Sequence, residues 1–214
     1  MTVKKLQKQT ESKSRDEGKA RRRAAIITAA KARFLEHGYA RMSMSGIIDE
    51  LGGSKATLWS YFSSKEDLFA AAIDDATRAF RLLMQTELDA KRDVVEVINY
   101  FTKKFVNRVT SPDAIALHRL IAGEVERFPS IGLIFYERAS GKTIALVKTY
   151  VEECMKAGAL RDDDAEEAAS MLLSLCLGTY YQRVLIGVEV ASVATETKEA
   201  ARVARQFLQY YLPR

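Results

Sequence analysis

Proline occurs at only three of the 214 positions, Pro112, Pro129 and Pro213, and this scarcity leaves long stretches free to form continuous helices. Proline ends a helix because it lacks a backbone N–H and its ring clashes with the preceding turn. Apolar residues recur through these stretches at three- and four-residue intervals. Strand-like alternation is confined to residues 188–190, which we interpret as a connector. The sequence therefore predicts an all-α protein.

Glycine and proline residues divide this helical pattern into about nine segments. The expected helices cover residues 19–37, 44–51, 54–62, 63–90, 92–110, 113–127, 131–157, 164–186 and 196–212. The first three predict a helix-turn-helix domain over residues 19–68, and the fourth joins it to a larger helical bundle within residues 69–214. Residues 1–18 are polar, and we expect them to form a basic disordered arm.

The sequence carries little that an enzyme or a membrane protein needs. The longest uncharged run of the second half, residues 168–182, is too short and too polar to cross a bilayer. Cys154 and Cys176 lack CxxC spacing, so we expect no zinc site, no disulfide scaffold and a reducing cytoplasm. Only two histidines are present, His37 and His118, and they stand far apart in a sequence without a GxSxG motif or a glycine-rich phosphate loop. We therefore expect a protein that is not an enzyme and that uses no cofactor or metal.

The net charge of +5 is concentrated at the N-terminus. Residues 1–23 hold nine basic and three acidic side chains, whereas the remaining 191 residues sum to −1. A basic segment on a nearly neutral body favours binding to phosphate, on a nucleic acid or an anionic lipid. Lipid is the weaker alternative, because the segment lacks the large apolar face of an interfacial helix. A solvated tail without a partner is the remaining interpretation.

Residues 43–61 predict two short helices around a turn that contains Gly52 and Gly53. The second helix places Trp59 and several small or hydroxylated side chains on its outer face, with Leu58 on the inner face. A helix that lies in the major groove of DNA needs donors and low bulk on the face that meets the bases. The alternative is that Trp59 and Tyr61 are both buried in the N-terminal core.

The same region carries an ordered signature. It comprises Phe34-x-x-x-Gly38-Tyr39, Ser43-Met44-x-x-Ile47 and the continuous run from Gly52 to Leu68. This pattern resembles the DNA-binding signature of the TetR family of transcriptional regulators. Trp59 and Ser60 replace the tyrosine and histidine that are commoner in that family, which leaves the base preference open.

The resemblance implies that the second and third helices are the DNA-reading element, with the third in the major groove. It implies DNA contacts from nine residues, Ser43, Ser54, Lys55, Ala56, Thr57, Trp59, Ser60, Tyr61 and Lys65. Lys55, Ala56 and Trp59 would lie nearest base edges. The hydroxyl groups of Thr57, Ser60 and Tyr61 would contact phosphate or base. Ser43 and Lys65 would bind backbone phosphate. The basic arm would follow the adjacent backbone or enter the minor groove.

The second half carries another resemblance. The run from His118 to Pro129, followed by Phe135 to Arg138, is similar to the AefR-like C-terminal domain of some bacterial members. This similarity implies a homodimer formed through the last two long helices and a cavity that senses a small lipophilic molecule. The side chains expected at the cavity are aromatic or polar, namely Phe101, Phe105, His118, Phe128, Tyr150, Tyr180 and Gln182. Each of these residue types is also common in a plain protein core.

The side chains expected at the subunit interface come from the apolar stripes of the last two helices. They are Leu172, Leu175, Ala200, Ala204, Phe207, Leu208 and Tyr211. The core of a monomer explains such stripes equally well.

Together these features predict a cytoplasmic, nucleoid-associated bacterial regulator with no membrane partner. As a dimer it would bind a palindromic operator in double-stranded DNA, repress transcription and be released by a small lipophilic effector. Two copies of the reading element spaced about 34 to 36 Å apart can address successive major grooves. The alternative is an all-helical scaffold or a nucleoid-type protein that binds DNA without sequence preference.

Overall fold

The computed structural model describes the backbone of residues 3–213 and the side chains of residues 14–213. Within this range the chain forms helices and no strands, so the all-α prediction is confirmed. The chain divides into two compact units, one ending at Asp75 and the other beginning at Ala76. None of the helices in the described range is both long and apolar enough to span a membrane.

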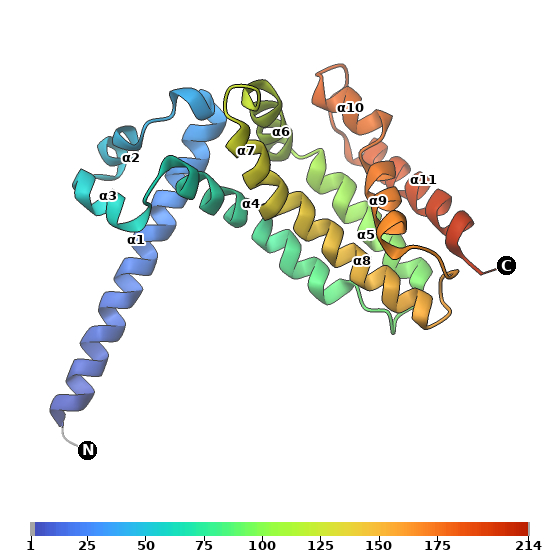
Figure 1. Ribbon diagram of the computed structural model, residues 1–214, viewed down its shortest axis with the longest axis horizontal. Coiled ribbons are helices and arrows are strands. Elements are labelled where there is room, and N and C mark those ends of the chain that lie inside the picture. The colour runs from blue at the N-terminus through green and yellow to red at the C-terminus, as the bar shows by residue number, and fades with distance from the viewer. Residues whose placement is uncertain (1–2, 214) are drawn as a thin grey trace. The chain divides into compact units, whose positions relative to one another are not determined.

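The N-terminal unit consists of α1 (Val3–Arg41), α2 (Met44–Leu51), α3 (Lys55–Tyr61) and the first half of α4 (Lys65–Glu87). Figure 1 shows α2 and α3 beside the C-terminal half of α1. An aromatic cluster forms the core: the ring of Phe69 packs edge-on against Phe34 and Tyr39, with centroids 4.9 and 5.3 Å away. All three side chains are buried, so α1 and α4 share one core in this unit.

The first helix is longer than predicted. The sequence predicts an unstructured arm up to residue 18, but α1 begins at Val3 and its backbone is helical from there up to a kink at Gly38 (φ 79°). The prediction was wrong because it gave weight to polarity alone. Residues 3–17 contain no proline or glycine and are rich in Lys, Gln, Glu and Arg, whose long side chains lose little freedom in a helix.

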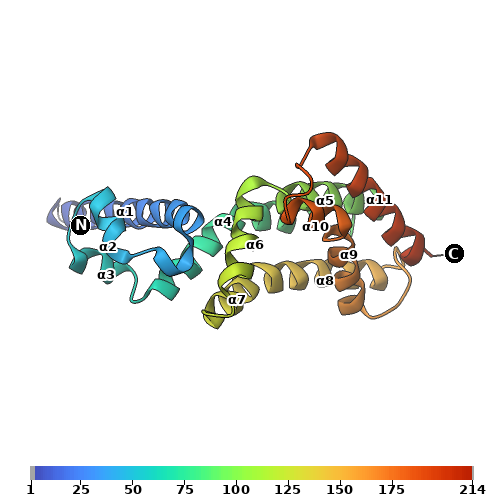
Figure 2. The ribbon, with the colours of Figure 1, turned by 90° about the horizontal axis from the view of Figure 1, so that it is seen from above.

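The C-terminal unit is a helical bundle. It contains the second half of α4 together with α5 (Val94–Val109), α6 (Pro112–Glu124), α7 (Pro129–Phe135), the π-helical turn η1 (Tyr136–Ser140), α8 (Gly141–Lys156), α9 (Ala165–Cys176), α10 (Thr179–Leu185) and α11 (Val193–Tyr211). Helix α11 packs along α5, and α8 packs along α9 (Figures 1 and 2). Phe101 on α5 and Phe207 on α11 are fully buried in the shared core.

Two of the predicted helices are interrupted. The one expected over 131–157 contains the turn η1, in which the amide of Gly141 pairs with the carbonyl of Tyr136. The one expected over 164–186 is divided into α9, which ends at Cys176, and α10, which begins at Thr179. Gly178, the residue before α10, has an extended backbone (φ −71°, ψ −161°). Ser140 of η1 and Leu177 after α9 both line a cavity described below.

Candidate nucleic-acid interface and internal cavity

The turn between α2 and α3 has a backbone that only glycine adopts readily. Gly52 and Gly53 have φ angles of 68° and 108°, in the region where a Cβ atom is strained. Each helix is capped by a serine: the amide of Gly46 donates to Ser43 Oγ and that of Thr57 donates to Ser54 Oγ, both at 3.1 Å. The start of each helix is therefore fixed by its own sequence.

Helix α3 has one buried face and one exposed face. Leu58 is 3% exposed and packs into the unit, whereas its neighbour Trp59 is 47% exposed. The alternative in which Trp59 belongs to the core is not what the structure shows. The predicted contact residues on this helix and in the caps are exposed, namely Ser43, Ser54, Lys55, Ala56, Thr57 and Ser60, and Tyr61 is half-buried. Their contacts with DNA stay a prediction.

Lys65 lies at the start of α4, where the sequence predicts a phosphate contact. Its Nζ atom is 3.3 Å from the carbonyl oxygen of Ala40 and 4.4 Å from the centre of the Tyr39 ring. The Tyr39 hydroxyl in turn donates to Glu66 Oε1 at 2.7 Å. This hydrogen bond lowers the pKa of Glu66, so the carboxylate is held in its charged form. The ammonium group is thus positioned over the end of α1 before any ligand binds.

Sequence reasoning missed two arginines that hold the turn in place. Arg22, assigned to the basic segment, donates to the carbonyl oxygens of Leu51 and Gly52. Arg33 on α1 forms an ion pair with Glu50 on α2, with an Nε–Oε2 distance of 2.9 Å. The available signal is spacing, because Arg22 stands four residues before the buried Ile26 and so lies on the inward side of α1.

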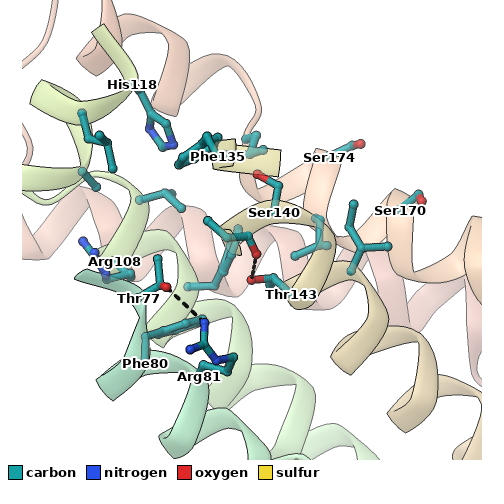
Figure 3. Close-up of a pocket in the computed structure, with 18 residues that line it drawn as sticks. Thr77, Phe80, Arg81, Arg108, His118, Phe135, Ser140, Thr143, Ser170 and Ser174 are labelled. Carbon is teal, nitrogen blue, oxygen red and sulfur yellow. Dashed lines mark hydrogen bonds between the residues drawn. The ribbon is translucent and has the colours of Figure 1, made fainter. Parts of the chain in front are cut away.

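The C-terminal unit contains a cavity of about 300 Å³. Its lining residues come from α4, α5, α6, α7, η1, α8 and α9, and Figure 3 shows the lining side chains. Its apolar lining includes Phe80, Phe105, Leu117, Phe135 and Leu173. Its polar lining consists of Thr77, Arg81, Arg108, His118, Ser140, Thr143, Ser170 and Ser174. An apolar cavity with a few polar groups is the usual form of a small-molecule site.

Two of the seven predicted cavity residues, Phe105 and His118, line this cavity. The other five do not, and the prediction was wrong for them. Phe101, Tyr150 and Tyr180 are buried in the bundle core, Phe128 is half-buried and Gln182 is exposed. The reason is the direction of each side chain, which helical periodicity alone does not assign to one neighbour or another.

His118 is a neutral hydrogen-bonding group in this wall. Burial, reinforced by the positive charge of Arg108, lowers its pKa from 6.5 to about 4. Its Nδ1 atom is 3.0 Å from the Tyr181 hydroxyl, and its ring meets Phe135 edge-on with centroids 5.2 Å apart. At neutral pH the side chain contributes no charge to the cavity.

Arg108 is a partly buried charge in the lining. Its Nη1 donates to Ser111 Oγ at 3.0 Å and its Nη2 to the carbonyl oxygen of Ala76 at 2.9 Å. Burial lowers the pKa of this guanidinium, and the nearby negative charge of Asp113 raises it by a smaller amount. Figure 3 shows Arg108, Thr77 and Arg81 on the side of the cavity formed by α4 and α5.

The prediction of a subunit interface is corrected by the burial of its residues. Leu172, Ala200, Ala204, Phe207, Leu208 and Tyr211 are between 0 and 6% exposed in a single chain, and Leu175 is partly buried against the same core. The stripe of α11 packs on α5 of its own chain, so the six buried side chains are covered without a second copy. An interface contact of Leu175 stays a prediction.

Within the described residues, no group of three or more His, Cys, Asp or Glu side chains is placed to hold a metal ion. Cys154 and Cys176 are buried free thiols. Burial raises the pKa of both, so neither is a reactive thiolate.

Family comparisons match both units of the chain. Residues 26–72 match the family described as bacterial regulatory proteins, tetR family. Residues 96–213 match the family described as AefR-like transcriptional repressor, C-terminal domain.

Curated relatives resemble only part of the chain. The HTH-type transcriptional repressor ComR of Escherichia coli (strain K12) is 31% identical over 106 residues, which is 49% of this chain and 50% of ComR. The HTH-type transcriptional repressor AcnR of Corynebacterium diphtheriae is 35% identical over 78 residues, 36% of this chain and 38% of AcnR. The chain thus spans half or less of the length of these relatives.

Solved structures match nearly the whole chain. A tetR-family transcriptional regulator from Mesorhizobium loti superposes with a TM-score of 0.80 at 23% identity, over 91% of this chain and 98% of that one. The Flavonoid-responsive Regulator FrrA superposes with a TM-score of 0.76 at 31% identity, over 91% and 99% of the two chains.

Proposed function

Because the chain belongs to the TetR family of bacterial transcriptional regulators, we propose that it represses transcription by binding an operator as a homodimer, under control of a small molecule. Proteins of this family bind DNA, act as dimers and are not enzymes. The observation that carries the proposal is the division of α3 into an inner face at Leu58 and an exposed face around Trp59. We place the activity in the bacterial cytoplasm, at the nucleoid.

The exposed face of α3 suits the major groove. Lys55 supplies a positive charge, Thr57 and Ser60 supply hydroxyl groups, and none of them is buried. A groove about 12 Å wide admits one helix and presents donors and acceptors to such side chains. Trp59 adds a large planar surface at the same face, which suits contact with bases or sugars.

The caps of the two short helices support phosphate binding. Ser43 and Ser54 are exposed and begin α2 and α3. Free amides at a helix N-terminus attract negative charge, and the ammonium group of Lys65 adds a full positive charge at the start of α4. These contacts fix the register of the reading helix without selecting bases.

For the dimer, we assign the contact to exposed residues rather than to the buried stripe. Ile186, Val188, Val190 and Val193 are 72, 70, 88 and 75% exposed between α10 and α11. A cluster of exposed apolar side chains in one short segment is typical of a protein interface. In a family of dimers, the partner that fits is a second copy of the chain. Val190→Asp should shift the protein toward monomer in light scattering.

Control by a ligand requires one helix that takes part both in the cavity and in the domain that binds DNA. Helix α4 contributes Phe69 to the N-terminal core and Thr77, Phe80 and Arg81 to the cavity wall. A ligand that favours one position of α4 shifts the dimer between DNA-binding and released states. A near-complete switch needs about 5.5 kcal/mol of difference in ligand affinity between the two states.

Gel retardation on the DNA upstream of the protein's own coding region tests the proposal. We expect a saturable shift that survives excess unrelated DNA and that Lys55→Ala weakens. Lys103→Ala, which removes an exposed lysine from α5 outside the reading element, is the matched control. Binding that salt abolishes and that shows no sequence preference would instead indicate a general DNA-binding scaffold.

A further inference from the structure

We propose that the cavity of the C-terminal unit takes a small organic acid, whose carboxylate pairs with Arg108 and whose apolar body lies among Phe80, Phe105 and Phe135. This inference names the ligand class and rests on the proposed function, in which this cavity is the sensor. Three observations support the inference: the charges of the lining, the hydrogen bonds of Arg108 and the shape of the cavity.

The charged side chains of the lining are basic. Among the described residues that form the cavity wall, two carry a guanidinium group, Arg81 and Arg108, and none carries a carboxylate. His118 is neutral and adds a hydrogen-bonding group only. A wall of this kind repels organic cations and attracts anions, and the effect is larger in an apolar enclosure than in water.

Arg108 is held by neutral acceptors only. It donates hydrogen bonds to the hydroxyl of Ser111 and the carbonyl of Ala76, and within the described part of the chain it forms no ion pair. A guanidinium group offers five N–H donors, so three remain for another partner. An enclosed charge is usually paired, because losing water without a counter-charge is costly. The charge of Asp113 acts on Arg108 without an ion pair, and a ligand carboxylate supplies a counter-charge in direct contact.

The rest of the lining defines the body of the acid. Aromatic rings from α4, α5 and α7 line the same cavity as Leu117 and Leu173. Phe80 and Phe135 are labelled in Figure 3. A volume of about 300 Å³ is at the lower end of the range for small-molecule sites. A compact aromatic or medium-chain aliphatic acid fits this space, and a large polar anion such as a nucleotide does not.

Matched pairs of an acid and its amide test the ligand class on the unmodified protein. The probes are 2-naphthoate, benzoate and octanoate, each titrated by calorimetry against its own primary amide at pH 7.5. The members of a pair have the same body and differ in charge. We expect at least one acid to bind about tenfold or more tightly than its amide, since a hydrogen bond to a charged group is worth more than one to a neutral group. If no acid binds more tightly than its amide, the proposal is overturned.

A variant then locates the charge. Arg108→Gln should weaken the preferred acid about tenfold or more and leave its amide unchanged. Lys103→Gln removes an equal charge from an exposed position of the same helix and should change neither affinity. If Arg108→Gln does not fold, Arg81→Gln provides the second test, because Arg81 lines the same cavity. An acid that binds the folded arginine variant as tightly as the unmodified protein would contradict the proposed site.

The titrations distinguish a failure of this inference from a failure of the proposed function. They measure ligand binding without DNA, whereas gel retardation measures DNA binding without ligand. A protein that shifts its operator but prefers the amides keeps the proposed function and loses the inference. A protein that prefers the acids but binds no specific DNA keeps the inference and loses the proposed function.

Discussion

The guanidinium group of Arg22 on α1 donates a hydrogen bond to the carbonyl oxygen of Leu51, with an Nη1–O distance of 3.1 Å. Its second nitrogen, Nη2, donates to the carbonyl oxygen of Gly52. Both acceptors belong to the end of α2, where the last carbonyls of a helix lack partners within the helix. One side chain of the basic segment therefore ties the first helix to the turn that sets the direction of α3.

We expect Arg22→Gln to lower the free energy of unfolding by about 1 kcal/mol, the usual value of such a hydrogen bond at a partly exposed site. Arg21→Gln is the matched control, because it removes the same charge from an exposed neighbour and should change stability by less than about 0.5 kcal/mol. Urea unfolding followed by circular dichroism measures both. Equal stabilities of the two variants would show that Arg22 acts only as a surface charge.

The reading face of α3 predicts opposite outcomes for adjacent residues. Trp59→Ala should weaken operator binding by about 1 to 3 kcal/mol because contact with DNA is lost, and it should change the stability of the fold little. Leu58→Ala should destabilise the protein by about 2 to 5 kcal/mol, because it leaves a cavity under the helix. Fluorescence anisotropy with operator DNA and thermal unfolding separate the two effects. A Trp59→Ala variant with unchanged operator affinity would remove this residue from the interface.

This contrast also shows what could be predicted from the sequence. The division of α3 into an inner and an outer face follows from local periodicity, since Leu58 and Phe62 are four residues apart and both are buried. The cavity wall does not follow from it. Phe101 and Phe105 are also four residues apart on α5, yet only Phe105 lines the cavity. Which neighbour a side chain meets depends on the packing of several helices, and one sequence pattern does not contain that information.

The stripe of α11 makes the same point about interfaces. Apolar spacing predicts that one face of this helix is covered, and it does not say whether its own chain or a second copy covers it. Phe207 is 0% exposed against its own core. The exposed segment between α10 and α11 lacks helical periodicity, so the pattern that selected the stripe did not reveal it.

Phe207→Ala should therefore act on folding. We expect a loss of about 3 to 5 kcal/mol in the free energy of unfolding, since the change empties a fully packed site. Gln209→Ala, two residues away on the exposed face of α11, should have an effect within about 0.5 kcal/mol. Chemical unfolding measured at two protein concentrations checks the prediction. A variant that keeps its stability and only dissociates into monomers would show that Phe207 belongs to the subunit interface.

His118 predicts a specific dependence of stability on pH. Its pKa is about 4 in the folded chain because of burial and the charge of Arg108, and its ordinary value is 6.5. Between these values the unfolded chain binds a proton that the folded chain does not, so stability is lost as the pH falls from 6.5 toward 4. The loss is about 1.4 kcal/mol for each pH unit within this window.

Urea unfolding at pH 7.5 and 5.5 measures this loss. His118→Gln should reduce the decline in stability between the two pH values by about 1 kcal/mol. His37→Gln, which removes the other histidine from the N-terminal unit, is the control and should leave the decline attributable to His118 intact. An equal decline in the wild-type protein and the His118→Gln variant would mean that another group carries the pH dependence.

The helical N-terminus gives the last prediction. Residues 1–18 hold five basic and three acidic side chains, and the backbone is helical from Val3 onward. If this segment contacts DNA phosphates, deleting residues 2–18 should weaken binding and flatten its dependence on salt, by about 0.9 in the logarithmic slope for each lost phosphate contact. Anisotropy titrations from low to physiological salt measure the slope for both proteins. The deletion leaves Arg21 and Arg23 in place, so binding should be weakened and not abolished. An unchanged slope would assign the electrostatic contacts to residues after position 18.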